Sequence, residues 1–78
     1  MLHNYFALVR TRSDAIRLSM SLKKLGLVVL RRPAPRTIGA DCVESVQFFS
    51  ASLPALACVQ RLFEKMEDGS YLEIDLDS

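Results

Sequence analysis

A helical stripe of apolar residues between two short apolar runs is the feature that most constrains how this chain folds. The stripe consists of Ala15, Leu18, Leu22 and Leu25, widened by Ile16 and Met20. Residues 5–9 and 27–30 are short apolar runs bounded by charge, as expected of strands. Thr11 or Ser13 is expected to cap the helix between them, and Gly26 to end it. The first half therefore predicts a strand–helix–strand unit.

The second half of the chain predicts a similar unit with a second helix. Residues 45–49 have the composition of a strand. Ser52 is placed to cap a following helix, Pro54 is tolerated in its first turn, and Gly69 would end it. The apolar stripe of this expected helix consists of Leu56, Val59, Phe63 and Met66. Residues 72–76 alternate between apolar and acidic, which predicts a strand with one solvent-facing side.

This order of elements predicts an α+β fold of the ferredoxin-like βαββαβ type. In that fold a four-stranded antiparallel sheet, in the order 4132, carries both helices on one face. A chain of 78 residues is expected to form one domain, residues 1–78. Residues 27–30, which run into Pro33 and Pro35, and the acidic residues 72–76 would form the sheet edges. Prolines and charges at an edge discourage pairing with other sheets.

Composition excludes several classes of protein. The net charge of +1 provides no field for nucleic acid or a membrane surface, and neither partner is expected. Two cysteines and one histidine are too few for a disulfide framework or a zinc site. We therefore expect no metal, no cofactor and a reducing, cytoplasmic location. No apolar run approaches the roughly 20 residues that cross a bilayer, and a secretion signal is not evident, so a soluble protein is expected.

The segment that leads to Cys42 is the main candidate for function. Pro33 and Pro35 are expected to shape a polar loop, in which Arg36 is the positive charge nearest to the thiol in sequence. Cysteine acts as a nucleophile in its thiolate form, and a guanidinium favours that form by lowering the thiol pKa. The same charge would stabilise a persulfide or selenide anion. Asp41 acts in the opposite direction, because a neighbouring carboxylate disfavours a second negative charge.

The expected topology adds further positive groups. The connection between the second and third strands would lie at the same end of the sheet as the turn into the first helix. Cys42 would then face Arg10, Arg12 and Ser13, at a helix start that has about half a positive charge. These residues together predict an anion-binding site around the thiol.

The spacing around this cysteine resembles that of a known family. Pro33-Ala34-Pro35-Arg36 is followed by Cys42 six positions later and by Phe48 six positions after that. Over nearly its whole length the chain resembles the DUF3343 family, small bacterial domains whose proposed role is to carry selenium or sulfur on a cysteine. The resemblance implies Cys42 as the carrier residue, Arg36 as its positive neighbour and Pro35 as the stiffener of the loop. The chain departs from the family at Ala40-Asp41, where the family has small residues, and at Val43, where it has glycine.

The leading hypothesis is a sulfur or selenium carrier. Cys42 would accept the atom from a donor protein and pass it to an acceptor protein, without catalytic turnover of its own. The alternative is an interaction or regulatory module without thiol chemistry, which forms a homodimer through its sheet. Tyr5, Val46 or Phe48 on an uncovered sheet face would favour that dimer. RNA recognition by the sheet is disfavoured, because the glycine–aromatic signature of such modules is missing.

Several residues also have a plain structural interpretation. Cys42 fits a small apolar residue packed beneath its loop, because free cysteine is often buried. Cys58 is expected to pack within the second helix. His3 is expected to be exposed and without a partner. Three arginines also suit a solvated sheet edge: Arg31, Arg32 and Arg36.

Overall fold

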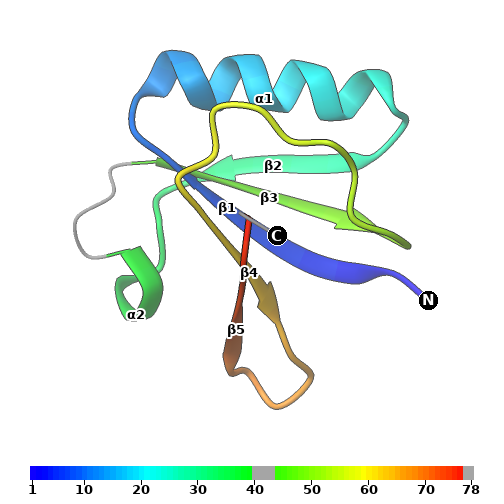
Figure 1. Ribbon diagram of the computed structural model, residues 1–78, viewed down its shortest axis with the longest axis vertical. Helices are drawn as coiled ribbons and strands as arrows, with labels where there is room; N and C mark the ends of the chain where they lie inside the picture. Colours follow the sequence, from blue (N-terminus) through cyan, green and yellow to red (C-terminus); the bar gives the residue numbers. More distant parts are fainter. Residues whose placement is uncertain (40–43, 77–78) are drawn as a thin grey trace.

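β1 (His3–Val9) is the central strand of a five-stranded antiparallel sheet in the computed structural model, which describes residues 1–39 and 44–76 (Figure 1). The strands lie in the order β2-β3-β1-β4-β5. The other strands are β2 (Val28–Arg32), β3 (Glu44–Ser50), β4 (Arg61–Lys65) and β5 (Tyr71–Ile74). The helices are α1 (Arg12–Lys24) and the four-residue α2 (Arg36–Gly39). The expected α+β class is confirmed.

α1 forms where its apolar stripe predicts a helix. Thr11, rather than Ser13, is the N-cap, and its Oγ1 accepts a hydrogen bond from the backbone N–H of Asp14 at 3.1 Å. The residues that α1 buries are Ala15, Leu18, Ser19 and Leu22. Gly26 follows the helix with a φ of +81°, a left-handed conformation that glycine adopts without a steric penalty. In the described parts of the chain, no helix is long and apolar enough to cross a membrane.

Strand alternation divides the apolar side chains between the two faces of the sheet. α1 packs across β2, β3 and β1 on one face, where the larger core lies. The buried members of this core are Tyr5, Ala7, Val9, Ala15, Leu18, Leu22, Val46, Phe48 and Leu62. Because burial of apolar surface is the main favourable term in folding, this layer provides most of the stability of the chain.

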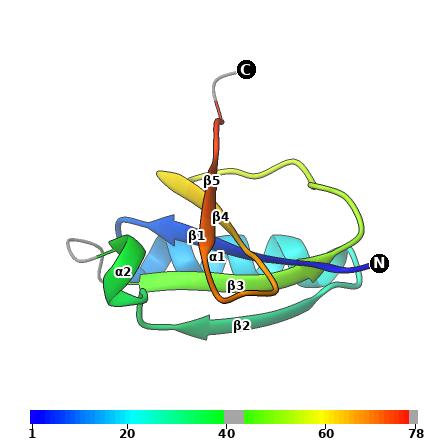
Figure 2. The ribbon, with the colours of Figure 1, turned by 90° about the horizontal axis from the view of Figure 1, so that it is seen from below.

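A smaller apolar cluster, formed by Phe6, Leu8 and Phe63, lies on the opposite face. Ile38 of α2 and Tyr71 of β5 pack against it. Figure 1 shows α1 above the sheet and α2 and β5 below it, and Figure 2 shows β5 running across the direction of the other strands. The expectation that two helices share one face is therefore wrong.

The second helix, expected to begin at Ser52, is not formed. Residues 51–60 are irregular, and β4 and β5 follow them as a hairpin. The neighbouring residues Leu62 and Phe63 are both buried, but on opposite faces of the sheet. A strand permits this arrangement, whereas a one-sided helical stripe does not. The left-handed φ of +65° at Cys58 also interrupts any helix across this segment.

Gly69 lies in the turn of a hairpin and does not end a helix. Its N–H donates to the carbonyl of Met66 at 3.0 Å, and its φ is +90°. The strand expected at residues 72–76 corresponds to β5, which pairs with β4 and not with β1. The sheet therefore has five strands in place of the expected four, and the ferredoxin-like order 4132 is not confirmed.

Candidate functional site

The Cys42 segment is bounded by two described elements at one end of the sheet. Cys42 itself, within residues 40–43, lies outside the described residues. α2 ends before this segment at Gly39, and β3 begins after it at Glu44. Glu44 pairs with Val9, the last residue of β1. The chain therefore re-enters the sheet beside the point at which β1 leads into α1.

Three predicted site residues follow β1 at this end of the sheet. Arg10, Arg12 and Ser13 are all exposed, and the last two are the first residues of α1. Because Thr11 is the cap, the Ser13 hydroxyl is not needed for that role. With the Gln60 amide in its hydrogen-bonding orientation, its oxygen accepts from Arg10 Nε at 2.7 Å and Nη2 at 3.2 Å. The guanidinium of Arg10 is therefore held in place.

Arg36 is the first residue of a turn that is anchored to the sheet. The carbonyl of Pro35 accepts a hydrogen bond from the N–H of Ile38 at 3.1 Å, which closes the turn of α2. Ala34 and Ile38 pack against the smaller apolar cluster. Pro33 and Pro35 restrict the backbone before this turn. The exposed side chain of Arg36 thus projects from a fixed position.

Arg32 belongs to a hydrogen-bonded chain across three strands. Its Nη1 donates to Gln47 Oε1 at 3.1 Å, and Gln47 Nε2 donates to Asn4 Oδ1 at 2.9 Å. Ser45 Oγ donates to the carbonyl of Arg32 at 2.8 Å. The nearly buried Gln47 thereby has a partner for each end of its amide, and it orients the Arg32 guanidinium. Nothing in the local sequence around Arg32 indicates this network.

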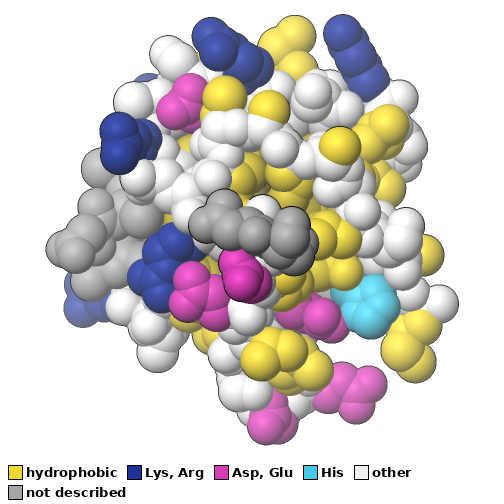
Figure 3. Space-filling model, viewed as in Figure 1, with side chains coloured by type: hydrophobic (Ala, Val, Ile, Leu, Met, Phe, Trp, Pro, Cys, Tyr) yellow, Lys and Arg dark blue, Asp and Glu magenta, His cyan; other side chains and the backbone are white. Residues whose placement is uncertain are grey.

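Positive charge gathers at the end of the molecule where α2 lies. Figure 3 shows Lys and Arg side chains around this end, at the left of the view, with some Asp and Glu side chains among them. Arg10 and Arg32 are held by hydrogen bonds to Gln60 and Gln47. Arg12 and Arg36 are exposed at the starts of α1 and α2. Such an end of the molecule favours an anion over a neutral group.

Cys58 is exposed, so the expectation that it packs within a helix is wrong. It lies in the irregular segment before β4, in a left-handed conformation. Its thiol is therefore accessible to reagents. Cys58 provides a comparison for Cys42 within the same chain.

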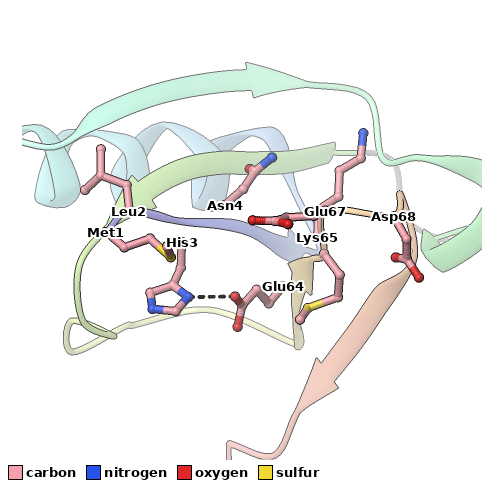
Figure 4. Close-up of a pocket in the computed structure, with 9 residues that line it drawn as sticks. Met1, Leu2, His3, Asn4, Glu64, Lys65, Glu67 and Asp68 are labelled. Carbon is pink, nitrogen blue, oxygen red and sulfur yellow. Dashed lines mark hydrogen bonds and ion pairs between the residues drawn. The ribbon is translucent and has the colours of Figure 1, made fainter.

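A groove of about 700 Å³ lies at the opposite end of β1, against the β4–β5 turn (Figure 4). It is lined by Met1, Leu2, His3, Asn4, Glu64, Lys65, Met66, Glu67 and Asp68. His3 Nδ1 lies 2.7 Å from Glu64 Oε2, so the expectation that His3 has no partner is wrong. Burial, and secondarily the Glu64 carboxylate, raise the pKa of Tyr5, whose ring centroid is 5.9 Å from that of His3. None of the predicted site residues lines this groove.

The aromatic surface expected to support a dimer is not exposed. Tyr5, Val46 and Phe48 are buried beneath α1 in the larger core. They lie on the sheet face that the helix covers, so the condition on which this dimer depended is not met. Dimerisation through these three side chains is incompatible with the fold.

Within the described residues, no group of three or more His, Cys, Asp or Glu side chains is placed to hold a metal ion. Comparison with known proteins found no family model, no curated protein and no solved structure that matches the chain.

Proposed function

We propose that this chain carries a sulfur or selenium atom on Cys42 and passes it between a donor protein and an acceptor protein. The pairing of Glu44 with Val9 is the observation that supports this most strongly. Cys42 precedes Glu44 by two residues in the sequence, and Val9 is followed by Arg10 and Arg12. The register thus brings the strand after the thiol to a positively charged end of the molecule.

Transfer of sulfur in this role passes through an anion at each stage. The Cys42 thiolate attacks the outer sulfur of a donor persulfide, an S–S bond to Cys42 forms, and the donor cysteine leaves as a thiolate. A nucleophile of the acceptor then attacks the outer sulfur of the Cys42 persulfide, and Cys42 leaves as a thiolate. Neighbouring guanidinium groups stabilise these anions through charge-assisted hydrogen bonds.

The arginines at this end differ in how firmly they are held and therefore in how freely they can bind an anion. A guanidinium has five N–H donors, so the two bonds from Arg10 to Gln60 leave donors for an anion. Arg36 projects from the anchored turn of α2, and Arg12 from the start of α1. We assign Arg36 as the principal anion-binding group, because it is also the residue that the resemblance to the DUF3343 family implies.

An exposed setting suits transfer between proteins better than turnover of a small molecule. Small-molecule sites are usually concave and enclose most of their ligand. The groove of about 700 Å³ lies at the end of β1 away from Val9, and a smaller pocket is lined by Gln60 and Arg61. Arg10, Arg12 and Arg36 line neither of them and are exposed on the surface. We therefore propose a carrier that docks its donor and acceptor in turn, with Cys42 as the transferring residue.

Mass spectrometry after incubation with a persulfide donor tests this function. We expect the mass of one added sulfur on Cys42, in the wild type and in a Cys58→Ser variant. A Cys42→Ser variant should lack the stable adduct, although it retains the exposed Cys58. An adduct found only on Cys58, or on neither cysteine, would rule out the carrier role.

A second pair of variants tests the anion-binding residue. Arg36→Gln should slow the loading of Cys42, because it removes a positive charge from the loop. Arg17→Gln, on the exposed surface of α1, is the matched control and should load at the wild-type rate. Equal rates for both variants would remove Arg36 from the site while leaving the role of Cys42 to the adduct experiment.

A further inference from the structure

The edge of the sheet at β2, with the flank of α1 beside it, has exposed apolar side chains on both faces of the sheet and is independent of Cys42. Within the described residues, β2 is hydrogen-bonded on one side, to β3. Four large apolar side chains are exposed on these two elements: Ile16 (42%), Met20 (58%), Val28 (61%) and Leu30 (46%). Val29 packs against the larger core, so by strand alternation Val28 and Leu30 face away from α1, whereas Ile16 and Met20 belong to α1 itself. Exposed apolar side chains on both sides of an unpaired strand edge favour a partner that covers both.

Ile16 and Met20 lie on the flank of α1 that overhangs β2. Each follows a sheet-facing residue, Ala15 or Ser19, and is turned from it by about 100° around the helix. β1 and β2 are parallel, since both pair antiparallel with β3. In the right-handed crossover expected between parallel strands, that turn points toward the β2 edge. Figures 1 and 2 show the 51–60 segment on the other side of α1, away from β2.

We propose that two copies of this chain pair through β2, antiparallel about a two-fold axis, and form one continuous sheet. When the pairing is centred on Leu30, Leu30 faces its own counterpart. Val28 then faces Arg32 of the second copy, and Val29 faces Arg31. No arginine opposes an arginine in this register. The charged edge therefore tolerates this register, although it discourages others.

The β2 edge and the flank of α1 together favour a second copy of the chain over a single extended peptide as the partner. An extended peptide would add a strand to β2 but has no second layer to cover Ile16 and Met20. A second copy supplies its own α1 on the same face of the sheet, so these two side chains meet their counterparts across the axis. Stable interfaces bury about 800 Å² per partner. The molecule measures 30 × 29 × 25 Å, so an interface of this size would occupy most of the side that carries β2 and the flank of α1.

Sedimentation equilibrium over about 10 µM to about 1 mM, the range in which interfaces of modest size associate, tests this proposal. We expect a reversible monomer–dimer equilibrium for the wild type. Leu30→Lys places two like charges opposite each other at the axis and should raise the dissociation constant by about tenfold or more. Leu72→Lys, on the opposite edge strand, is the matched control because Leu72 is similarly exposed, and it should leave the equilibrium unchanged.

A cross-linking experiment tests the register. In a Cys42→Ser, Cys58→Ser background, Leu30→Cys should form a disulfide-linked dimer, because side chains directly opposite each other have Cβ atoms about 5 Å apart. Leu72→Cys should remain monomeric under the same oxidation. Circular dichroism spectra of all variants should match that of the wild type, since the substituted side chains are exposed.

Two outcomes would overturn the proposal. One is a wild-type chain that remains monomeric at every concentration, which would leave the β2 edge to a different partner. The other is a dimer that withstands Leu30→Lys, or that Leu72→Lys disrupts equally. Neither outcome bears on the loading of Cys42, which is measured separately.

Discussion

Tyr5 and Phe48 lie opposite each other on β1 and β3, with their ring centroids 5.2 Å apart and tilted by 31°, beneath α1. Phe48 is the largest side chain that is fully buried. Aromatic pairs at this separation contribute beyond the burial of their area. The pair is therefore the centre of the larger core, and its loss should affect stability more than that of any neighbouring aromatic residue.

Phe48→Ala should lower the free energy of unfolding by about 3–5 kcal/mol, because it removes a buried ring and leaves a cavity. Phe49→Ala is the matched control. Phe49 is only partly buried and lies on the other side of the strand, so its loss should be clearly smaller. Urea denaturation of the two variants measures the difference. Equal losses would contradict the assignment of Phe48 to the core.

Alkaline pH should destabilise the chain through Tyr5. Its pKa is raised above the usual 10.0 by burial and by Glu64. The folded state thus keeps the Tyr5 proton at a pH near 10, where the unfolded chain loses it. The contribution of Tyr5 to the free energy of unfolding is therefore complete below pH 10 and falls as the pH rises above it. Tyr5→Phe should show a smaller fall in unfolding free energy between about pH 8 and about pH 11. Identical pH dependence in the two proteins would show that Tyr5 ionises freely.

Thr11→Ala should lower the free energy of unfolding by about 1 kcal/mol, because the backbone N–H of Asp14 loses its partner at the start of α1. Ser13→Ala should have little effect, since its exposed hydroxyl does not cap the helix. Thermal denaturation followed by circular dichroism compares the two. A larger loss of unfolding free energy for Ser13→Ala than for Thr11→Ala would contradict the assignment of Thr11 as the N-cap.

Cys58→Gly should stabilise the chain by up to about 1 kcal/mol, because a non-glycine residue at a φ of +65° is strained. Ala57→Gly is the control at the preceding exposed position. It should destabilise by about 0.4–1 kcal/mol, since it only adds freedom to the unfolded chain. Equal effects of the two substitutions on the urea midpoint would contradict the left-handed conformation of Cys58.

The fold from β1 to β3 was largely predictable because its signals are local. The stripe from Ala15 to Leu22 has one period throughout, and Thr11 and Gly26 mark its ends. The apolar runs in β1 and β3 are too short for helices, and their residues are buried. In these segments, local propensity and tertiary packing favour the same structure.

The prediction of a second helix was wrong because the apolar spacing that fits a helix also fits a loop followed by a strand. Leu56 and Val59 pack against the larger core from an irregular segment, and Phe63 belongs to the opposite face. Tertiary pairing of β4 with β1 overrides the helical spacing. No local signal distinguishes these outcomes, since the pairing partner of β4 lies more than 50 residues earlier in the chain.

Long-range contacts at both ends of β1 could not be predicted from the sequence either. The pairing of His3 with Glu64 joins residues 61 positions apart, and Gln60 reaches Arg10 across the start of β4. Both contacts depend on the hairpin that replaces the expected helix. The arginines at the α2 end were identifiable from the sequence, whereas the partners that orient Arg10 and Arg32 were not.

The rate at which iodoacetamide alkylates Cys42 in a Cys58→Ser protein, measured between about pH 5 and about pH 9, tests the central claim most directly. We predict that the rate reaches half its maximum well below the value of about 8.5 for an ordinary thiol, and that Arg36→Gln moves this midpoint toward that value. A rate that follows an ordinary thiol in both proteins, or a thiol that does not react at any pH, would contradict the carrier role of Cys42.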